Sequence, residues 1–178
     1  MKKKEIILGV TASIAIYKAC ELIRRLREIG FNVTVVMTKE AKRLILPLLF
    51  ENLSGNRVYS ELFKKDDFDI KHISLAERAD LVLIAPATAN IIGKIASGIA
   101  DDLLSCIILA TRAKVIFCPA MDENMYNNKV VQENIRKLKS YGYKFIGPEK
   151  GKLASGKIGR GRLADLDNII KEVKTTLS

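Results

Sequence analysis

The sequence predicts a single domain with a doubly wound α/β fold, in which helices cover both faces of a parallel sheet. The chain has 178 residues, 48% hydrophobic and 28% charged, which suits one packed core and excludes a disordered chain. Short apolar runs alternate with stretches where apolar residues recur every three or four positions, as in strands separated by amphipathic helices. Because parallel strands are joined by right-handed crossovers, this alternation puts helices on both faces of the sheet.

Apolar, often β-branched runs mark the strands, and they are spaced widely enough for a helix to lie between them. The run at 80–86 is apolar on both faces, which is typical of a central strand in a parallel sheet. Residues 56–71 show no period and are expected to form a loop or an edge strand, and residues 72–79 lead into the central strand. The predicted strands are residues 5–10, 32–37, 80–86, 114–118 and 143–146.

Helical spacing first occurs from Ile16 onwards, and Gly30 stands where a C-cap glycine belongs. Thr38 is a good N-cap for a short helix that runs through Ala41. The glycine-rich, basic segment 149–163 is expected to be a loop within the same domain. Further helices are predicted over residues 44–53, 89–97, 101–112, 129–141 and 166–177.

The net charge of +10 comes from 30 Lys and Arg against 20 Asp and Glu. Such an excess can attract nucleic acid, an acidic membrane surface or an anionic small substrate. Aromatic residues make up only 6% and Trp is absent, whereas nucleic-acid surfaces interleave aromatic and basic side chains. Acidic residues are also mixed with the basic ones along the helices. The charge is therefore expected to solvate helix surfaces, and no nucleic-acid partner is predicted.

No segment is predicted to enter a membrane, since the longest apolar runs are far too short to span a bilayer. Three lysines before the first run resemble the start of a signal peptide, but polar residues soon interrupt that run. Cys20, Cys106 and Cys118 are scattered in apolar stretches, which excludes a disulfide framework and a CxxC metal knuckle. They are expected to be inert core residues of a cytoplasmic protein, and no metal site is predicted.

The ends of the predicted strands are the first candidates for a ligand site, because ligands bind there in doubly wound sheets. The first turn, residues 9–14, lacks a GxGxxG pattern, and the second strand ends at Thr38 instead of an acidic residue, so a dinucleotide is disfavoured. The small and hydroxyl residues of that turn suit one phosphate group or a flavin edge, with an ordinary helix cap as the alternative. Turns 86–90 and 119–126 have similar chemistry, which favours a shared ligand site.

A lone histidine and a basic segment also bear on chemistry. Any imidazole general base must be His72, unless this residue is structural or merely exposed. Segment 150–162 holds four glycines and five cations and is predicted to close over an anionic substrate. A disordered RNA-binding tail is the alternative, but apolar residues within the segment and the helix that follows disfavour it. Met121 and Met125 are expected to pack in the core.

Five motifs in this order resemble those of the homo-oligomeric flavin-containing cysteine decarboxylases. They are Ala-Ser-Ile-Ala-Ile-Tyr-Lys at 12–18, His-Ile-Ser-Leu at 72–75, Pro-Ala-Thr-Ala-Asn at 86–90, Pro-Ala-Met-Asp at 119–122 and Leu-Ala-Ser-Gly at 153–156. The resemblance covers nearly the whole chain and is strongest with the phosphopantothenoylcysteine decarboxylases. It implies a flavodoxin- or Rossmann-like sheet and FMN-dependent decarboxylation of 4'-phosphopantothenoylcysteine to 4'-phosphopantetheine in coenzyme A biosynthesis.

The resemblance also implies a role for particular residues. FMN would oxidise the cysteinyl group to a thioaldehyde-like species, carbon dioxide would leave, and the reduced flavin would return its electrons to the resulting enethiol. His72 would be the catalytic base and Ser155 would stand at the second catalytic position, while Asp122, Ala154 and Gly156 would bind substrate. The residues expected to contact FMN are Ala12, Ser13, Ile14, Thr38, Thr88, Ala89, Asn90 and Ala120.

Two positions depart from the family pattern. Asp122 stands where many members have Asn, and a charged carboxylate there would repel the carboxylate of the substrate. Ser155 stands where many members have a cysteine that donates the last proton, and a hydroxyl is a far weaker acid than a thiol. Either another group donates that proton, or the reaction stops at the enethiol, as in peptidyl-cysteine decarboxylases.

Family members are trimers or assemblies of trimers with sites between subunits, so the resemblance implies a homo-oligomer, either a trimer or a dodecamer of trimers. Because the sequence ends at Ser178, the ligase that makes the phosphorylated substrate is expected to be a separate protein or a C-terminal domain that was removed. The alternatives are a flavin prenyltransferase-like relative, a non-catalytic regulatory flavoprotein subunit and an RNA-binding domain.

Overall fold

A parallel sheet forms the centre of the protein, whose computed structural model describes residues 3–63 and 71–178. Its strands are β1 (Glu5–Val10), β2 (Asn32–Met37), β3 (Leu81–Ala87), β4 (Lys114–Pro119) and β5 (Lys144–Phe145). They are arranged in the order β2-β1-β3-β4-β5, and all neighbours are parallel. Strand β3 lies in the middle and is buried along its whole length, as its two apolar faces predict. Each predicted strand is present, and its ends differ by one residue at most.

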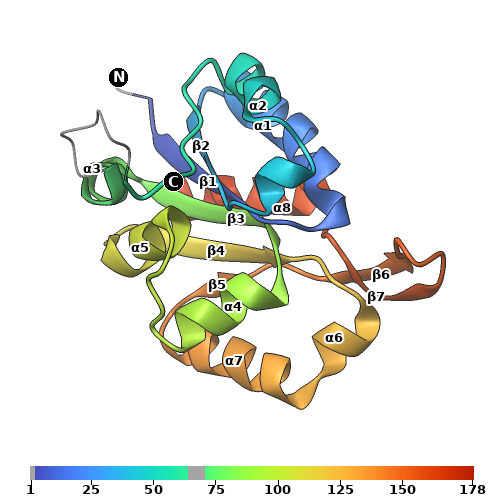
Figure 1. Ribbon diagram of the computed structural model, residues 1–178. Coiled ribbons are helices and arrows are strands. Elements are labelled where there is room, and N and C mark those ends of the chain that lie inside the picture. Colours follow the sequence, from blue (N-terminus) through green and yellow to red (C-terminus); the bar gives the residue numbers. More distant parts are fainter. Residues whose placement is uncertain (1–2, 64–70) are drawn as a thin grey trace.

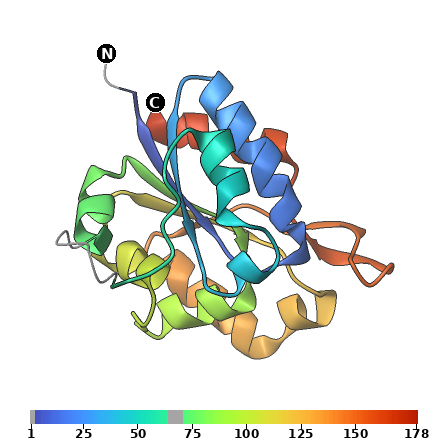
Figure 2. The same cartoon turned by 45° about the horizontal axis from the view of Figure 1, so that its top comes forward.

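Helices form a layer on each face of this sheet. They are α1 (Lys18–Glu28), α2 (Pro47–Ser54), α3 (Lys71–Arg78), α4 (Ala89–Ala96), α5 (Leu103–Ala110), α6 (Glu123–Asn127), α7 (Lys129–Ser140) and α8 (Leu166–Leu177), with 3₁₀ turns η1 (Ile14–Tyr17) and η2 (Ala41–Arg43). One layer contains α1, α2 and α8, and the other contains α3, α4, α5 and α7 (Figures 1 and 2). The doubly wound fold is therefore confirmed, with the flavodoxin-like strand order.

Strand β1 shows why the inner strands are apolar at every position. Ile6 and Leu8 face the layer of α1 and α8, whereas Ile7 faces the layer of α4 and α5. All three side chains are fully buried, and burying each of them contributes roughly 1.5–3 kcal/mol. Successive residues of a strand point to opposite faces, so a sheet with two covered faces needs apolar residues at both.

Several helix ends follow the predicted caps. Gly30 has a φ of +97° just after α1, a backbone conformation that glycine adopts without strain. Pro47 begins α2, where its missing amide costs nothing, so this helix begins later than the predicted residue 44. The short helix after Thr38 is η2, which begins at Ala41 instead of ending there. Within the described ranges, no helix is long and apolar enough to cross a lipid bilayer.

The basic segment 149–163 is a hairpin, so the prediction of a loop is wrong. Strands β6 (Glu149–Lys152) and β7 (Ile158–Arg162) pair antiparallel and project from the side of the sheet where β1 and β3 end (Figure 1). Glycines occupy one face of the hairpin, at Gly151, Gly159 and Gly161. Because these residues have no side chain, the segment lacks the alternation of apolar and polar side chains that identifies a strand.

Two short helices are absent from the sequence-based prediction. Helix α3 begins at Lys71 and buries only Leu75 and Ala76, too few residues to show a period. Helix α6 has five residues and one buried side chain, Tyr126. The prediction for 56–71 is tested in part only: Tyr59 forms an isolated bridge with Val36, and residues 64–70 lie outside the described part of the chain.

Candidate active site

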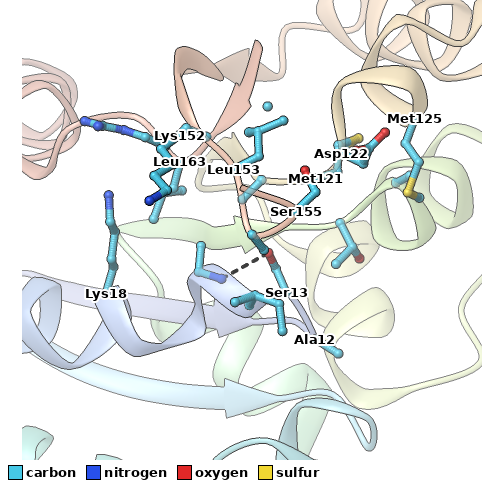
Figure 3. Close-up of a pocket in the computed structure, with 18 of the residues that line it drawn as sticks. Ala12, Ser13, Lys18, Met121, Asp122, Met125, Lys152, Leu153, Ser155 and Leu163 are labelled. Carbon is cyan, nitrogen blue, oxygen red and sulfur yellow. Dashed lines mark hydrogen bonds between the residues drawn. The ribbon is translucent and has the colours of Figure 1, made fainter. Parts of the chain in front are cut away.

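A pocket of about 640 Å³ opens at the carboxyl ends of β1, β3 and β4 (Figure 3). The chain runs from β1 to β2 on one side and from β3 to β4 on the other, so these neighbouring strand ends form the topological switch point of the sheet. The turns after the three strands line part of the pocket, and the hairpin lines the rest. Predicted site residues that line it are Ala12, Ser13, Ile14, Thr88, Ala89, Ala120, Asp122, Ala154 and Ser155.

Thr11 ties the turns after β1 and β3 together. Its side chain is buried, and its Oγ1 donates to the carbonyl oxygen of Pro86 at 2.7 Å and accepts from the amide of Thr88 at 3.1 Å. One hydroxyl can serve as donor and acceptor at once, so the distance between the two turns is set without a ligand. Thr11 lies in the predicted turn 9–14, but this role is not visible in the sequence, because its partner Pro86 lies 75 positions away.

Hydroxyl caps give these turns their polar character. Ser13 Oγ accepts from the Ala15 amide at 3.3 Å (Figure 3), and Thr88 Oγ1 accepts from the Ile91 amide at 3.5 Å. The amides at the very start of a helix have no carbonyl partner within that helix, and they attract anionic or carbonyl oxygens. The small side chain of Ala12 beside them lets a planar ring approach the backbone. The arrangement suits an oxygen-rich planar cofactor.

The turn after β4 brings a carboxylate and two methionines to the pocket. Asp122 Oδ1 accepts from the Asn124 amide at 2.8 Å and so begins α6. Met121 is half-buried against the core, as expected. Met125 is 50% exposed and lines the pocket, so the prediction that it packs in the core is wrong. A helix of five residues buries few side chains, and Met125 faces the pocket.

Basic side chains gather at one end of the pocket. Lys18 at the start of α1 and Lys152 on β6 lie on one side, and Asp122 and Met125 lie on the other (Figure 3). Arg162 also lines the pocket, and its guanidinium pairs with Asp165 at 2.8 Å. In the part of the chain that the structure describes, neither lysine forms an ion pair. Two ammonium groups without a counter-charge favour an anionic ligand at this end.

Four predicted site residues do not line this pocket. Thr38 is buried at the end of β2, where its Oγ1 accepts from the Ala41 amide at 3.2 Å. Asn90 is exposed on the first turn of α4, and Gly156 is exposed in the turn of the hairpin. His72 lies on α3, at the end of the molecule away from the hairpin (Figures 1 and 2). Within one chain, His72 and the pocket are therefore apart.

The cysteines are not activated nucleophiles. Cys118 is fully buried, and burial raises the pKa of its thiol far above the ordinary value. Cys20 and Cys106 are only partly buried, so the prediction that all three cysteines lie in the core is correct only for Cys118. Burial still raises the pKa of both thiols, and near Cys106 the charges of Asp102 and Asp101 add to this effect. None of the three lines the pocket.

The chain is similar to known proteins over its whole length. The family model described as Flavoprotein matches residues 1–178. The chain is 46% identical over 177 residues to a probable phosphopantothenoylcysteine decarboxylase of Streptococcus mutans, across 98% of this chain and 99% of that protein. It is also 46% identical over 172 residues to the coenzyme A biosynthesis bifunctional protein CoaBC of Bacillus subtilis, across 96% of this chain. The chain spans 42% of that bifunctional protein's length.

Solved structures share the same architecture. A PPC decarboxylase mutant complexed with pantothenoylaminoethenethiol is 31% identical, with a TM-score of 0.87 over 98% of both chains. The FMN-dependent cysteine decarboxylase SpaF is 28% identical, with a TM-score of 0.85 over 98% of this chain and 95% of the other. The likeness extends over nearly the whole chain.

Proposed function

This chain belongs to the Flavoprotein family, and from that premise we propose that it is an FMN-dependent carboxy-lyase that converts 4'-phosphopantothenoylcysteine to 4'-phosphopantetheine in coenzyme A biosynthesis. The observation that carries the proposal is that the three strand-end turns and the basic hairpin meet in a single pocket. The 46% identity with a probable phosphopantothenoylcysteine decarboxylase over almost its full length supports it.

The strand-end turns fit a flavin, and FMN is the form we propose. Ala12, Ala89 and Ala120 leave room for a planar ring, and the caps Ser13 and Thr88 stand beside amides that suit its oxygen atoms. When bound, FMN would supply the oxidation and reduction that the decarboxylation requires. The residues of the chain would orient the substrate, exclude water and move protons.

The hairpin and the basic end fit the substrate. Lys18 and Lys152 would attract the phosphate group, because their positive charges are not matched by acidic side chains among the described residues. Ala154 and Ser155 would cover the cysteinyl end, opposite Asp122. One carboxylate oxygen of Asp122 accepts the Asn124 amide, so this side chain is held in place by the helix that it begins.

A homo-oligomer would bring the histidine of a neighbouring chain to the pocket, since His72 lies apart from the pocket of its own chain. Ile14 and Tyr17, which line the pocket, are 63% and 62% exposed. Leu46 and Leu48 are 72% and 63% exposed. Large apolar side chains left exposed in this way are typical of contacts between subunits. We propose a trimer or a dodecamer built from trimers, with His72 as the base in a neighbour's site.

Ser155 supports a second candidate, a decarboxylase that stops at the enethiol. The hydroxyl of Ser155 lines the pocket, and no cysteine of the described chain does. A hydroxyl is a far weaker acid than a thiol, so the last proton has no acidic donor at this position. For the full reaction, we propose that the proton comes from solvent.

A cytoplasmic location and a ligase partner complete the proposal. Cys20, Cys106 and Cys118 are free thiols, which suits a reducing compartment. The Bacillus subtilis relative is bifunctional, and this chain spans only 42% of it. We propose that the ligase that produces the phosphorylated cysteine substrate acts as a partner of this chain.

The test is the visible spectrum of the purified protein, followed by turnover of 4'-phosphopantothenoylcysteine. We expect release of about one FMN per chain, and carbon dioxide together with 4'-phosphopantetheine as products. A product lighter by two hydrogens would favour the second candidate. Bound flavin without carbon dioxide release would indicate a non-catalytic flavoprotein subunit, and a colourless protein that takes up no FMN would overturn the proposal.

A further inference from the structure

We propose that Glu123 is a positioning residue that holds the β6–β7 hairpin over the pocket. Glu123 is the first residue of α6, and its Oε1 accepts from the backbone amide of Arg160 on β7 at 2.8 Å. Its side chain is half-buried and does not line the pocket. The consequence of this contact for substrate binding rests on the proposed function, but the contact itself does not.

The carboxylate of Glu123 lies where the backbone of β7 comes very close to the turn after β4. A Cβ atom at Gly161 would lie 2.1 Å from the carbonyl oxygen of Met121, and one at Gly159 would lie 2.5 Å from Oε2 of Glu123. The Met121 amide also donates to the Gly161 carbonyl at 3.0 Å. Strand β7 therefore rests directly on the turn after β4, and the Glu123 carboxylate fills the space that glycine leaves.

The side chain of Arg160 makes a second contact with α6. Its guanidinium carbon lies 5.5 Å from the ring centroid of Tyr126, which is buried. Arg160 is thus bound by α6 through both its amide and its guanidinium. A hydrogen bond to an ionised carboxylate is roughly twice as strong as a neutral one, so the Glu123 contact is the stronger of the two.

The position of this contact couples two parts of the pocket. Helix α6 begins with Asp122 as its cap and carries Met125, and both line the pocket. The hairpin carries Ala154 and Ser155, which line it from the other side. Since Glu123 joins α6 to β7, it sets the separation of these two groups, and so the space available to the substrate between them.

Nothing local in the sequence points to this role. An acidic residue in the first turn of a helix ordinarily interacts with the helix dipole, and Glu123 fits that description. Its partner lies 37 positions later, in a segment whose strand character is hidden by its glycines.

The experiment compares Glu123→Ala, Glu123→Gln and the control Asn127→Ala, which changes an exposed residue of the same helix. Amide hydrogen exchange of residues 158–162 is measured on the FMN-loaded full chain, together with KM, kcat and flavin content. Loss of a charge-assisted hydrogen bond predicts that Glu123→Ala exchanges faster in β7 and has a KM raised about tenfold, with kcat within about twofold of wild type. Glu123→Gln keeps an acceptor oxygen but loses the charge, so its effects should be smaller than those of Glu123→Ala, and the control should match wild type.

Unchanged hydrogen exchange in Glu123→Ala would overturn the proposal, as would a variant whose kcat falls while its KM stays constant. Equal defects in Glu123→Gln and Glu123→Ala would also contradict it, because only the alanine variant lacks the acceptor. If the wild-type protein failed to turn over the phosphorylated cysteine substrate, the proposed function would fall. Hydrogen exchange would then still decide whether Glu123 holds the hairpin.

Discussion

The pocket has two walls that are built differently. The strand-end wall (Ala12, Ser13, Ile14, Thr88, Ala89 and Ala120) follows directly from the sheet, and the buried Thr11 hydroxyl fastens two of its turns together. The hairpin wall (residues 152–155 and 161–163) stands out from the sheet, and residues 154–158 at its tip are exposed. Its contacts with the turn after β4 and with α6 lie along β7, where residues 160 and 161 meet residues 121–126.

The two walls also differ in charge. The strand-end wall has small apolar side chains and hydroxyl caps, whereas the hairpin wall carries Lys152 and Arg162. A wall fixed by the sheet suits a cofactor that stays bound through many turnovers. A wall held along one strand, with an exposed tip, suits an anionic substrate that enters and leaves at each turnover. The difference indicates that cofactor affinity and substrate affinity can be altered separately.

The largest expected effect comes from a residue in neither wall. We expect His72→Asn to lower carbon dioxide release by at least about a hundredfold with unchanged flavin content, because it removes the proposed base. Mixed assemblies of His72→Asn and Gly161→Ala chains should regain part of the activity, since some sites would combine an intact pocket with an intact histidine. Full activity of His72→Asn alone would show that the two walls of one chain suffice.

Gly161→Ala should damage the hairpin wall alone. The new Cβ would lie 2.1 Å from the Met121 carbonyl oxygen, so β7 must move away from the turn after β4. We expect KM to rise more than about tenfold while FMN affinity changes less than about twofold, because overpacking displaces only the hairpin. Gly93→Ala is the matched control, since its Cβ would meet only the Asn134 amide nitrogen at 3.7 Å. Equal loss of FMN and substrate affinity would mean that the walls are not separable.

Thr11→Val should damage the strand-end wall alone. Valine keeps the shape of threonine but leaves the Pro86 carbonyl and the Thr88 amide without their hydrogen bonds. We expect the Kd for FMN to rise about tenfold in a flavin fluorescence titration, with KM nearly unchanged at saturating FMN. Thr11→Ser retains the hydroxyl and should bind FMN almost as wild type does. A wild-type Kd for Thr11→Val would show that the hydroxyl does not set the spacing of the turns.

Ser155→Cys tests the chemistry of the hairpin tip. A thiol is a better proton donor than a hydroxyl, so the share of product released as enethiol should fall severalfold, while carbon dioxide release stays within about twofold. Mass analysis of the products distinguishes the two species. An unchanged product ratio would indicate that the side chain at 155 does not deliver the last proton.

Asp102→Ala should leave both walls intact and affect only the scaffold. Burial acts to raise the pKa of Asp102, but hydrogen bonds from Lys94 and from Ser105 outweigh it and hold this pKa below its ordinary value. Because the pKa of Asp102 is lowered in the folded state, its ionised carboxylate stabilises the protein at pH values above the ordinary pKa of 3.8. This stabilisation is lost as the pH falls through the lowered pKa. We expect the free energy of unfolding to drop by about 1–2 kcal/mol at pH 7, with a smaller difference under acidic conditions. Activity should not change.

Local sequence patterns were sufficient to predict the sheet and the strand-end wall. Strands such as β1 and β3 are apolar at every position because each face is covered, and the small and hydroxyl residues after them are local properties of a turn. The carboxyl ends of parallel strands meet at one edge of the sheet, so Ser13, Thr88 and Asp122 were predicted to share a site, and the structure brings them to one pocket.

The other parts of the pocket depend on contacts between residues that are far apart in the sequence. Thr11 acts through Pro86, and Glu123 acts through Arg160. Lys18 and Lys152 line one pocket only when the hairpin is in place. The hairpin was not predicted because its glycines hide the alternation of a strand, and the groups that Gly159 and Gly161 approach, the Glu123 side chain and the Met121 carbonyl, are distant in sequence. Periodicity in the sequence indicates whether a residue is buried. It does not indicate which residue packs against it, because that partner depends on how the strands and helices are arranged in three dimensions.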